Sequence, residues 1–237
     1  MGRILAVGDI HGCAKTLESM IDQMEIMHDD QVVFMGDYID RGNGVFQVIE
    51  RLIALKEEYG DCITFIMGNH EQMFLQYLKD TGRHDEVRMF RYNGGTSTIN
   101  GYLEGLGLFQ DHTDITWDML PQNHKDFYDN LVVCHEIDRY VFVHAGVRPN
   151  VKLGDQLMHD MIWIREEFLT WPMEVLPGRF VVHGHTPMEP HELDAYHEKY
   201  HDKFNTDSAC VFGYELTCRD LTNDKVIKVK CLDQRVA

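Results

Sequence analysis

The chain alternates short apolar runs with segments whose apolar residues recur at helical spacing. The apolar runs of the first third are Ile4–Val7, Val32–Met35 and Thr64–Met67, and the helical spacing covers 14–28, 45–55 and Glu71–Lys79. Apolar runs of this length, bounded by glycine, are typical of buried strands. The repeated strand–helix order predicts an α/β fold with parallel strands and right-handed crossovers.

The remaining two thirds carry weaker signals. Residues 83–130 are rich in glycine and polar side chains, which predicts short helices and loops, either a substrate-selecting cap over a site or a solvated face. Strand character returns at Tyr140–Val143 and Arg179–Val182, and the segments Ala209–Thr217 and Lys225–Cys231 are predicted to form a hairpin. No linker divides the chain, so we expect a single domain over residues 1–237.

Charge and cysteine usage narrow the classes of protein that remain. The chain has 39 acidic and 22 basic residues and a formal net charge of -17, without a basic run, which argues against nucleic-acid binding. No apolar run approaches the roughly 20 residues of a membrane span. The first strand starts at once, leaving no room for a signal peptide, and the six cysteines lack CxxC spacing. We therefore expect free thiols and a cytoplasmic protein without membrane contact.

Polar clusters follow the predicted strands directly. They read Gly-Asp-Ile-His-Gly at 8–12, Gly-Asp-Tyr-Ile-Asp-Arg-Gly at 36–42, Gly-Asn-His-Glu at 68–71, His-Ala-Gly at 144–146 and His-Gly-His-Thr at 183–186. The ends of parallel strands meet at one edge of a sheet, so we expect these side chains to converge. The candidate metal ligands are Asp9, His11, Asp37, Asn69, His144 and either His183 or His185.

This set of ligands indicates a particular kind of metal site. Mixed oxygen and imidazole donors without thiolate suit manganese, iron or zinc rather than calcium. Six ligands are too many for one ion that keeps an open position, but they suit two ions that share a carboxylate. Such a pair activates a water molecule and holds the oxygens of an in-line displacement at phosphorus.

The five ordered motifs resemble the phosphoprotein-phosphatase branch of the calcineurin-like metallophosphoesterases, and in particular the bacterial and phage serine/threonine phosphatases. The resemblance runs from Gly8 to Thr186 and extends to the segment after Asp207. It implies a four-layer α-β-β-α fold, with a central β-sandwich flanked by helices. It also implies two divalent ions, with Mn²⁺ expected and iron or zinc as alternatives, and a phosphorylated protein or peptide as substrate.

The resemblance assigns a role to each motif residue. It implies that Asp9 and His11 bind the first metal, that Asp37 bridges, and that Asn69, His144 and His185 complete the second site, where Asn69 also meets the substrate. His183 stands two residues before His185 and is the alternative for the last position.

The same resemblance implies the residues that act on the phosphate ester. His70 is the expected general acid, and Asp40 is expected to pair with it and orient it. Arg41 and Arg165 are expected to hold the phosphate oxygens. The alternative for Arg165 is an ordinary surface arginine on a helix beside two glutamates.

Other activities remain open on the same scaffold. A symmetrical diadenosine-tetraphosphate hydrolase is the nearest alternative, although Asp40 and Glu71 favour the monoesterase. A nuclease or cyclic phosphodiesterase fits less well, because Pro187 follows Thr186 where a second ligand histidine would stand. A non-catalytic binding module is a further alternative, but every catalytic position is filled.

Overall fold

Two stacked β-sheets form the centre of the molecule. The computed structural model describes residues 2–79 and 88–234. The first sheet has the strand order β3 (Ile63–Phe65), β2 (Gln31–Phe34), β1 (Ile4–Val7), β8 (Glu215–Asp220) and β9 (Lys225–Lys230). The second has the order β4 (Cys134–Ile137), β5 (Tyr140–Val143), β6 (Phe180–His183) and β7 (Lys203–Asn205). Strands β1–β3 are mutually parallel, as are β5–β7, whereas β4, β8 and β9 pair antiparallel.

The alternation of side chains along each strand explains the stacking. In β1, Leu5 and Val7 join the core beneath the helices, whereas Ala6 faces Phe142 and other residues of the second sheet. In β5, Val141 packs toward the helices of the far side. Both faces of these strands are therefore buried, which is why their sequences read as unbroken apolar runs.

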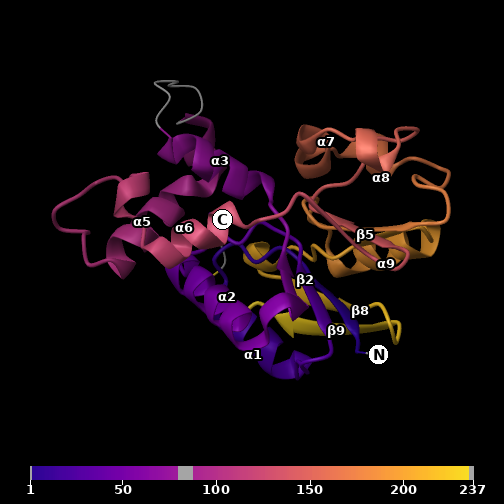
Figure 1. Cartoon of the computed structure of the whole chain (residues 1–237), viewed down its shortest axis with the longest axis horizontal. Helices are drawn as coiled ribbons and strands as arrows, with labels where there is room; N and C mark the ends of the chain where they lie inside the picture. Colours follow the sequence, from indigo (N-terminus) through magenta and orange to yellow (C-terminus); the bar gives the residue numbers. More distant parts are fainter. Residues whose placement is uncertain (1, 80–87, 235–237) are drawn as a thin grey trace.

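Helices cover the outer face of each sheet (Figure 1). The helices associated with the first sheet are α1 (Ala14–Met24), α2 (Val45–Tyr59), α3 (Asn69–Leu78), α5 (Thr96–Gly105) and α6 (Gln122–Asp129). Those of the second are α7 (Met158–Trp163), α8 (Glu166–Leu169) and α9 (Pro190–Lys199). Short helical turns are η1 (Gly60–Cys62), η2 (Arg91–Gly95), η3 (Trp117–Met119), η4 (Leu153–Asp155) and η5 (Cys210–Phe212). The predicted α/β fold with a sandwich flanked by helices is thus confirmed, and no helix in the described ranges is long and apolar enough to cross a membrane.

The C-terminal tail fixes the start of α1. The carboxylate of Asp233 accepts the backbone N–H groups of Lys15 at 3.2 Å and Thr16 at 3.0 Å, and the Thr16 hydroxyl at 2.7 Å. The N-cap position itself is Cys13, whose side chain makes no capping hydrogen bond. A residue distant in sequence therefore satisfies the free N–H groups of the first turn.

The closing hairpin is confirmed, but its first strand was predicted too long. Strand β8 begins only at Glu215, because Ala209 is left-handed at φ 59° and the 3₁₀ turn η5 follows it. The Asp207 carboxylate accepts the Ala209 N–H at 3.0 Å, a local bond that competes with strand pairing. The helix predicted over 14–28 likewise stops at Met24, where Glu25 adopts a left-handed conformation. Part of the predicted segment 83–130 lies outside the described residues; the rest forms short helices and loops, as expected.

Candidate active site

Five strands of the two sheets deliver polar side chains to one place. Asp9 and His11 follow β1, and Asp37 follows β2. Asn69 is the first residue of α3, the helix after β3. His144 and His185 follow β5 and β6 in the second sheet. All six side chains belong to residues that are at most 3% exposed. So many buried polar groups require close partners.

Asp37 lies at the centre of this cluster. Its Oδ2 is 3.4 Å from Nε2 of His11 and 3.8 Å from Nε2 of His70, whereas its Oδ1 is 3.3 Å from Nε2 of His144. Two groups of possible metal-binding atoms share this carboxylate: His11, Asp37 and His70 on one side, and Asp37, His144 and His185 on the other. One carboxylate between two sets of donors is the arrangement that two ions require.

Two histidines are each held by a backbone carbonyl at Nδ1. Nδ1 of His11 lies 2.8 Å from the carbonyl of Ile39, and Nδ1 of His144 lies 2.8 Å from the carbonyl of Met35. With each Nδ1–H donating to its carbonyl, Nε2 is the ring atom directed toward Asp37, and it becomes a ligand once a competing cation displaces any proton that it carries.

The second half of the cluster is crowded with acceptors. Oδ1 of Asn69 lies 2.8 Å from Nδ1 of His185 and 3.1 Å from Nε2 of His144, and the two imidazole nitrogens are 3.2 Å apart. Oδ1 of Asp9 and Nε2 of His185 are buried without a hydrogen-bond partner in the described part of the chain. Buried oxygen and imidazole atoms that converge, two of them unpartnered among the described residues, fit divalent cations.

The charges of the carboxylates agree with this interpretation. Although burial acts in the opposite direction, the imidazoles of His144 and His70 hold the pKa of Asp37 well below its usual range. Burial and the neighbouring carboxylate of Asp207 raise the pKa of Asp9 well above normal. Burial also raises the pKa of Asp207 to about 6. Burial and mutual repulsion thus disfavour the ionised forms of Asp9 and Asp207, and a bound cation would offset that cost.

His70 is held by a chain of short hydrogen bonds. Its Nδ1 is 2.6 Å from Oδ2 of Asp40, as the expected pairing of these two residues requires. The other oxygen of Asp40 accepts the hydroxyl of Thr98 at 2.5 Å, and the same hydroxyl accepts the Asp40 N–H at 2.9 Å. Thr98 lies on α5 and is fully buried. The sequence did not predict this contact, since it shows only a hydroxyl residue shortly after Gly94-Gly95.

Two arginines reach the cluster from opposite sides. The guanidinium of Arg41 lies 2.5 Å from Nε2 of His11 and 3.0 Å from Nε2 of His70. Arg165, between α7 and α8, donates to the carbonyl of His185 at 3.1 Å and to the hydroxyl of Thr186 at 3.0 Å. Arg165 therefore borders the site rather than an open helix surface. Both side chains are placed where a bound anion could meet their planar forks.

Left-handed backbone recurs at the polar residues of the site. His11, Asp37, Asp40, Arg41 and His185 have φ between 46° and 69°. Residues with side chains rarely adopt this conformation, and they do so at functional sites where surrounding contacts enforce it.

A family model for the calcineurin-like phosphoesterases matches residues 2–221. The chain belongs to the calcineurin-like phosphoesterase family. A serine/threonine-protein phosphatase PP2A-like PPG1 from Saccharomyces cerevisiae is 32% identical over 158 residues, which cover 65% of this chain and 35% of that protein. The expected resemblance to the phosphoprotein-phosphatase branch is thereby confirmed, although the chain spans only about a third of that relative.

Solved structures share the fold. A putative diadenosine tetraphosphatase superposes with a TM-score of 0.67 at 20% identity, covering 98% of this chain and 95% of that chain. A protein serine/threonine phosphatase from Saccharomyces cerevisiae, with similarity to human phosphatase PP5, gives a TM-score of 0.62 at 14% identity, covering 98% and 81%. At these identities the likeness concerns the fold.

The family and the donor set agree with each other. The chain carries a calcineurin-like phosphoesterase domain, and the buried donors of that domain fit two divalent metal ions.

Of the two histidines considered for the last ligand position, only His185 faces this phosphoesterase site. Nε2 of His183 lies 3.3 Å from the hydroxyl of Tyr196, and its ring packs edge-on against Phe168 at 4.9 Å. Burial lowers the pKa of His183 to about 3, so the imidazole is neutral where it packs between Phe168 of α8 and Tyr196 of α9.

Glu71 is a further residue whose contacts the sequence did not reveal. Its buried carboxylate accepts four backbone N–H groups, from Asp37 at 2.9 Å, Tyr38 at 2.8 Å, Ile39 at 3.3 Å and Gly68 at 3.0 Å. It thereby ties the loop that carries Asp37 to the loop that carries Asn69. From the sequence alone, Glu71 only favoured a monoesterase over a dinucleotide hydrolase.

Proposed function

We propose that this phosphoesterase is a phosphomonoesterase that acts on phosphoserine and phosphothreonine in proteins or peptides. The observation that carries the proposal is the Asp40–His70 pair beside the Asp37 cluster, with 2.6 Å between its atoms. A serine or threonine alkoxide is a poor leaving group, so its departure depends on a positioned proton donor.

The proposed roles follow from these contacts. Asp9, His11, Asp37, Asn69, His144 and His185 hold two divalent ions, which supply an activated water and a positive clamp on the phosphate oxygens when bound. We propose Mn²⁺ as the ion, since the donor set is imidazole, carboxylate and amide oxygen. Arg41 and Arg165 orient the phosphate from the two sides on which their guanidinium groups lie.

Proton delivery falls to His70. Its Nδ1–H donates to Asp40, which fixes the orientation of the ring. The ring then directs Nε2 toward Arg41 and Asp37, and this nitrogen is the atom that we propose carries the proton when substrate is bound. From there it can pass to the oxygen of the departing serine or threonine. We also propose that the whole chain acts as one domain in the cytoplasm.

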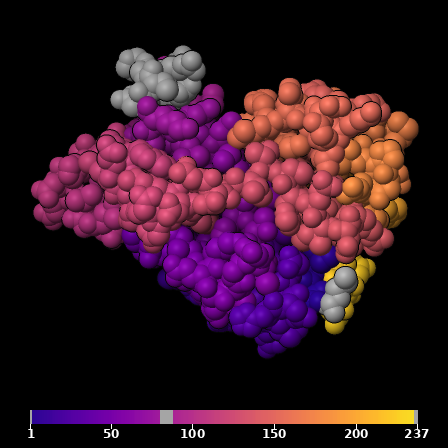
Figure 2. Space-filling model, in the orientation of Figure 1, coloured from indigo at the N-terminus to yellow at the C-terminus, as the bar shows by residue number. Residues whose placement is uncertain are grey.

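A second candidate is hydrolysis of a dinucleotide such as diadenosine tetraphosphate. A hollow of about 760 Å³ is lined by Arg88, Met89, Arg91, Tyr92, Asn93 and Trp163. The ring of Trp163 lies 6.1 Å from the ring of His185, so the hollow adjoins the site, and Tyr92 is 91% exposed. Figure 2 shows the surface hollowed between the part that carries α3 and the part that carries α7. Exposed aromatic rings beside arginines can stack on a nucleobase, at about 1–3 kcal/mol per base.

The experiment that decides between them is a parallel phosphate-release assay with added Mn²⁺. The substrates are a phosphoserine/phosphothreonine peptide and diadenosine tetraphosphate, each with the wild-type protein and with Tyr92→Ala. Preferential turnover of the peptide, with little effect of Tyr92→Ala, is the expected result. Preferential conversion of the dinucleotide to ADP, with KM raised by Tyr92→Ala, would replace the proposal with the second candidate.

A further inference from the structure

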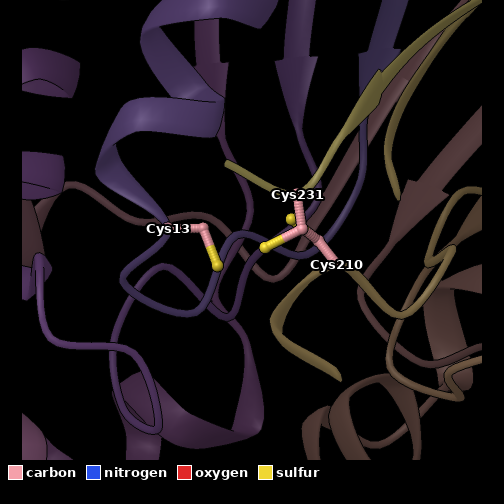
Figure 3. Close-up of side chains that lie close together, drawn as sticks. All are labelled: Cys13, Cys210 and Cys231. Atoms are coloured by element: carbon pink, nitrogen blue, oxygen red, sulfur yellow. The ribbon is translucent and has the colours of Figure 1, made fainter. Parts of the chain in front are cut away.

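Three cysteines from distant parts of the chain meet beside α1. Cys13 precedes α1, Cys210 begins the turn η5, and Cys231 follows β9. Their three Sγ atoms all lie within 4.8 Å of one another. Figure 3 shows the side chain of Cys13 directed toward those of Cys210 and Cys231. The spacing of these residues in the sequence gives no sign of this cluster.

We propose that Cys13, Cys210 and Cys231 form a second metal site, which binds a soft, thiophilic cation such as Zn²⁺ or Cu⁺. Thiolate ligands select such ions, whereas the Asp/His/Asn donors of the phosphoesterase site suit harder ones. The two sites are therefore chemically distinct, and this inference does not depend on which ester the enzyme hydrolyses.

The distances suit a cation without rebuilding the fold. A Zn–S bond is about 2.3 Å, so sulfurs that share one ion lie about 4 Å apart. Atoms within 4.8 Å of one another need to move by less than about 1 Å to reach that spacing. Two of the thiols make one long hydrogen bond each to a backbone carbonyl. Sγ of Cys13 lies 3.8 Å from the carbonyl of His11, and Sγ of Cys231 lies 3.7 Å from the carbonyl of Asp233. Because S–H groups are weak donors, breaking these two hydrogen bonds costs little when a cation binds the sulfurs.

The surroundings provide both enclosure and access. Cys13 and Cys210 are buried in the core between the first sheet and its helices, whereas Cys231 is partly exposed and offers a path from solvent. A bound ion would join the loop after His11, the turn after Asp207 and the C-terminal tail. We therefore expect it to raise the thermal unfolding temperature.

The simplest alternative is that the three thiols merely pack as small apolar side chains. A titration with Cd²⁺, in the presence of excess Mn²⁺ that fills the Asp/His/Asn site, separates the two. Charge-transfer absorption from sulfur to cadmium arises only where thiolates bind the metal. We expect this absorption to saturate at one Cd²⁺ per chain, together with a rise in the unfolding temperature.

Cysteine-to-serine variants show which thiols bind the Cd²⁺. Cys231→Ser, at the partly exposed position, and Cys210→Ser should each lower the affinity for Cd²⁺ at least tenfold, while Cys62→Ser and Cys134→Ser, outside the cluster, should leave it unchanged. Circular dichroism identifies any variant that fails to fold, and Cys231→Ser is the variant least exposed to that risk. No sulfur–cadmium absorption in the wild-type protein would overturn the proposal. So would absorption that survives Cys231→Ser, or a disulfide within the cluster in the purified protein that leaves Cd²⁺ unbound.

Discussion

Thr98 is predicted to position the general acid although it touches no substrate. Its hydroxyl donates to Asp40 at 2.5 Å and accepts the Asp40 N–H at 2.9 Å, and Asp40 in turn holds His70. Thr98→Val keeps the shape of the side chain and removes both hydrogen bonds. A hydrogen bond to a charged group contributes about 1.5–3 kcal/mol. Losing that amount from the alignment of His70 lowers kcat about 10- to 100-fold.

The same substitution has a separate cost in stability. It leaves the buried N–H of Asp40 unpaired, at about 1–3 kcal/mol, so we expect the free energy of unfolding to fall by a comparable amount. Thr98→Ser is the matched control, because it retains the hydroxyl.

The assay is phosphate release from a phosphoserine peptide and from an aryl phosphate, over a range of substrate concentrations and below the unfolding temperature. We expect kcat to fall in Thr98→Val with KM unchanged, and to fall more for the peptide, whose leaving group needs the proton. Near wild-type kcat in Thr98→Val, or a loss of the same size in Thr98→Ser, would refute the argument.

Three further predictions concern other parts of the molecule. His70→Asn should keep its metal but lose about 10²–10⁴-fold in rate on a phosphoserine peptide and less on p-nitrophenyl phosphate; equal losses would tell against a general acid. Asp233→Ala removes the cap of α1 and should lower the free energy of unfolding by about 1–2 kcal/mol in urea denaturation, and an unchanged midpoint would contradict this role. Burial and the Arg219 charge lower the pKa of His197 to about 4, so the native state excludes a proton that the unfolded chain binds below pH about 6.5. The free energy of unfolding should therefore fall as the pH decreases from about 6.5 to about 4, with at most about 3 kcal/mol of the fall due to His197, and it should fall less steeply in His197→Gln; equal slopes would show that this histidine makes no contribution.

The strand ends were predictable because two local signals coincide there. Apolar runs such as Ile4–Val7 mark strands buried on both faces, and a glycine followed by a ligand residue marks where each strand ends. The structure brings the six predicted metal-binding residues together at this edge, with Asp40 beside His70. Their individual roles remain predictions.

The division into two sheets could not be read from the residues alone. A run such as Tyr140–Val143 is buried on both faces in either sheet, so only the resemblance indicated a sandwich. Strand β7 was missed because it carries a buried Lys203, whose ammonium donates to the carbonyls of Phe168 at 3.0 Å and Trp171 at 2.9 Å. A lysine in a short segment gives no signal of burial until its partners are known.

Contacts between distant segments account for the other omissions. Thr98 meets Asp40, Asp233 caps α1, and the three cysteines converge, in each case across long stretches of chain. Such contacts depend on how the sheets and helices pack, and no local pattern of residues encodes them.

The measurement that tests the central claim most directly is metal content and phosphate release on the same purified samples of wild-type protein, Asp37→Asn and Asp22→Asn. Asp37 lies between both sets of donors, whereas Asp22 is an exposed residue of α1. We predict that the wild type and Asp22→Asn bind two Mn²⁺ ions per chain and release phosphate, and that Asp37→Asn loses both the Mn²⁺ and the activity. Full metal content and full activity in Asp37→Asn would contradict a two-ion site centred on this carboxylate.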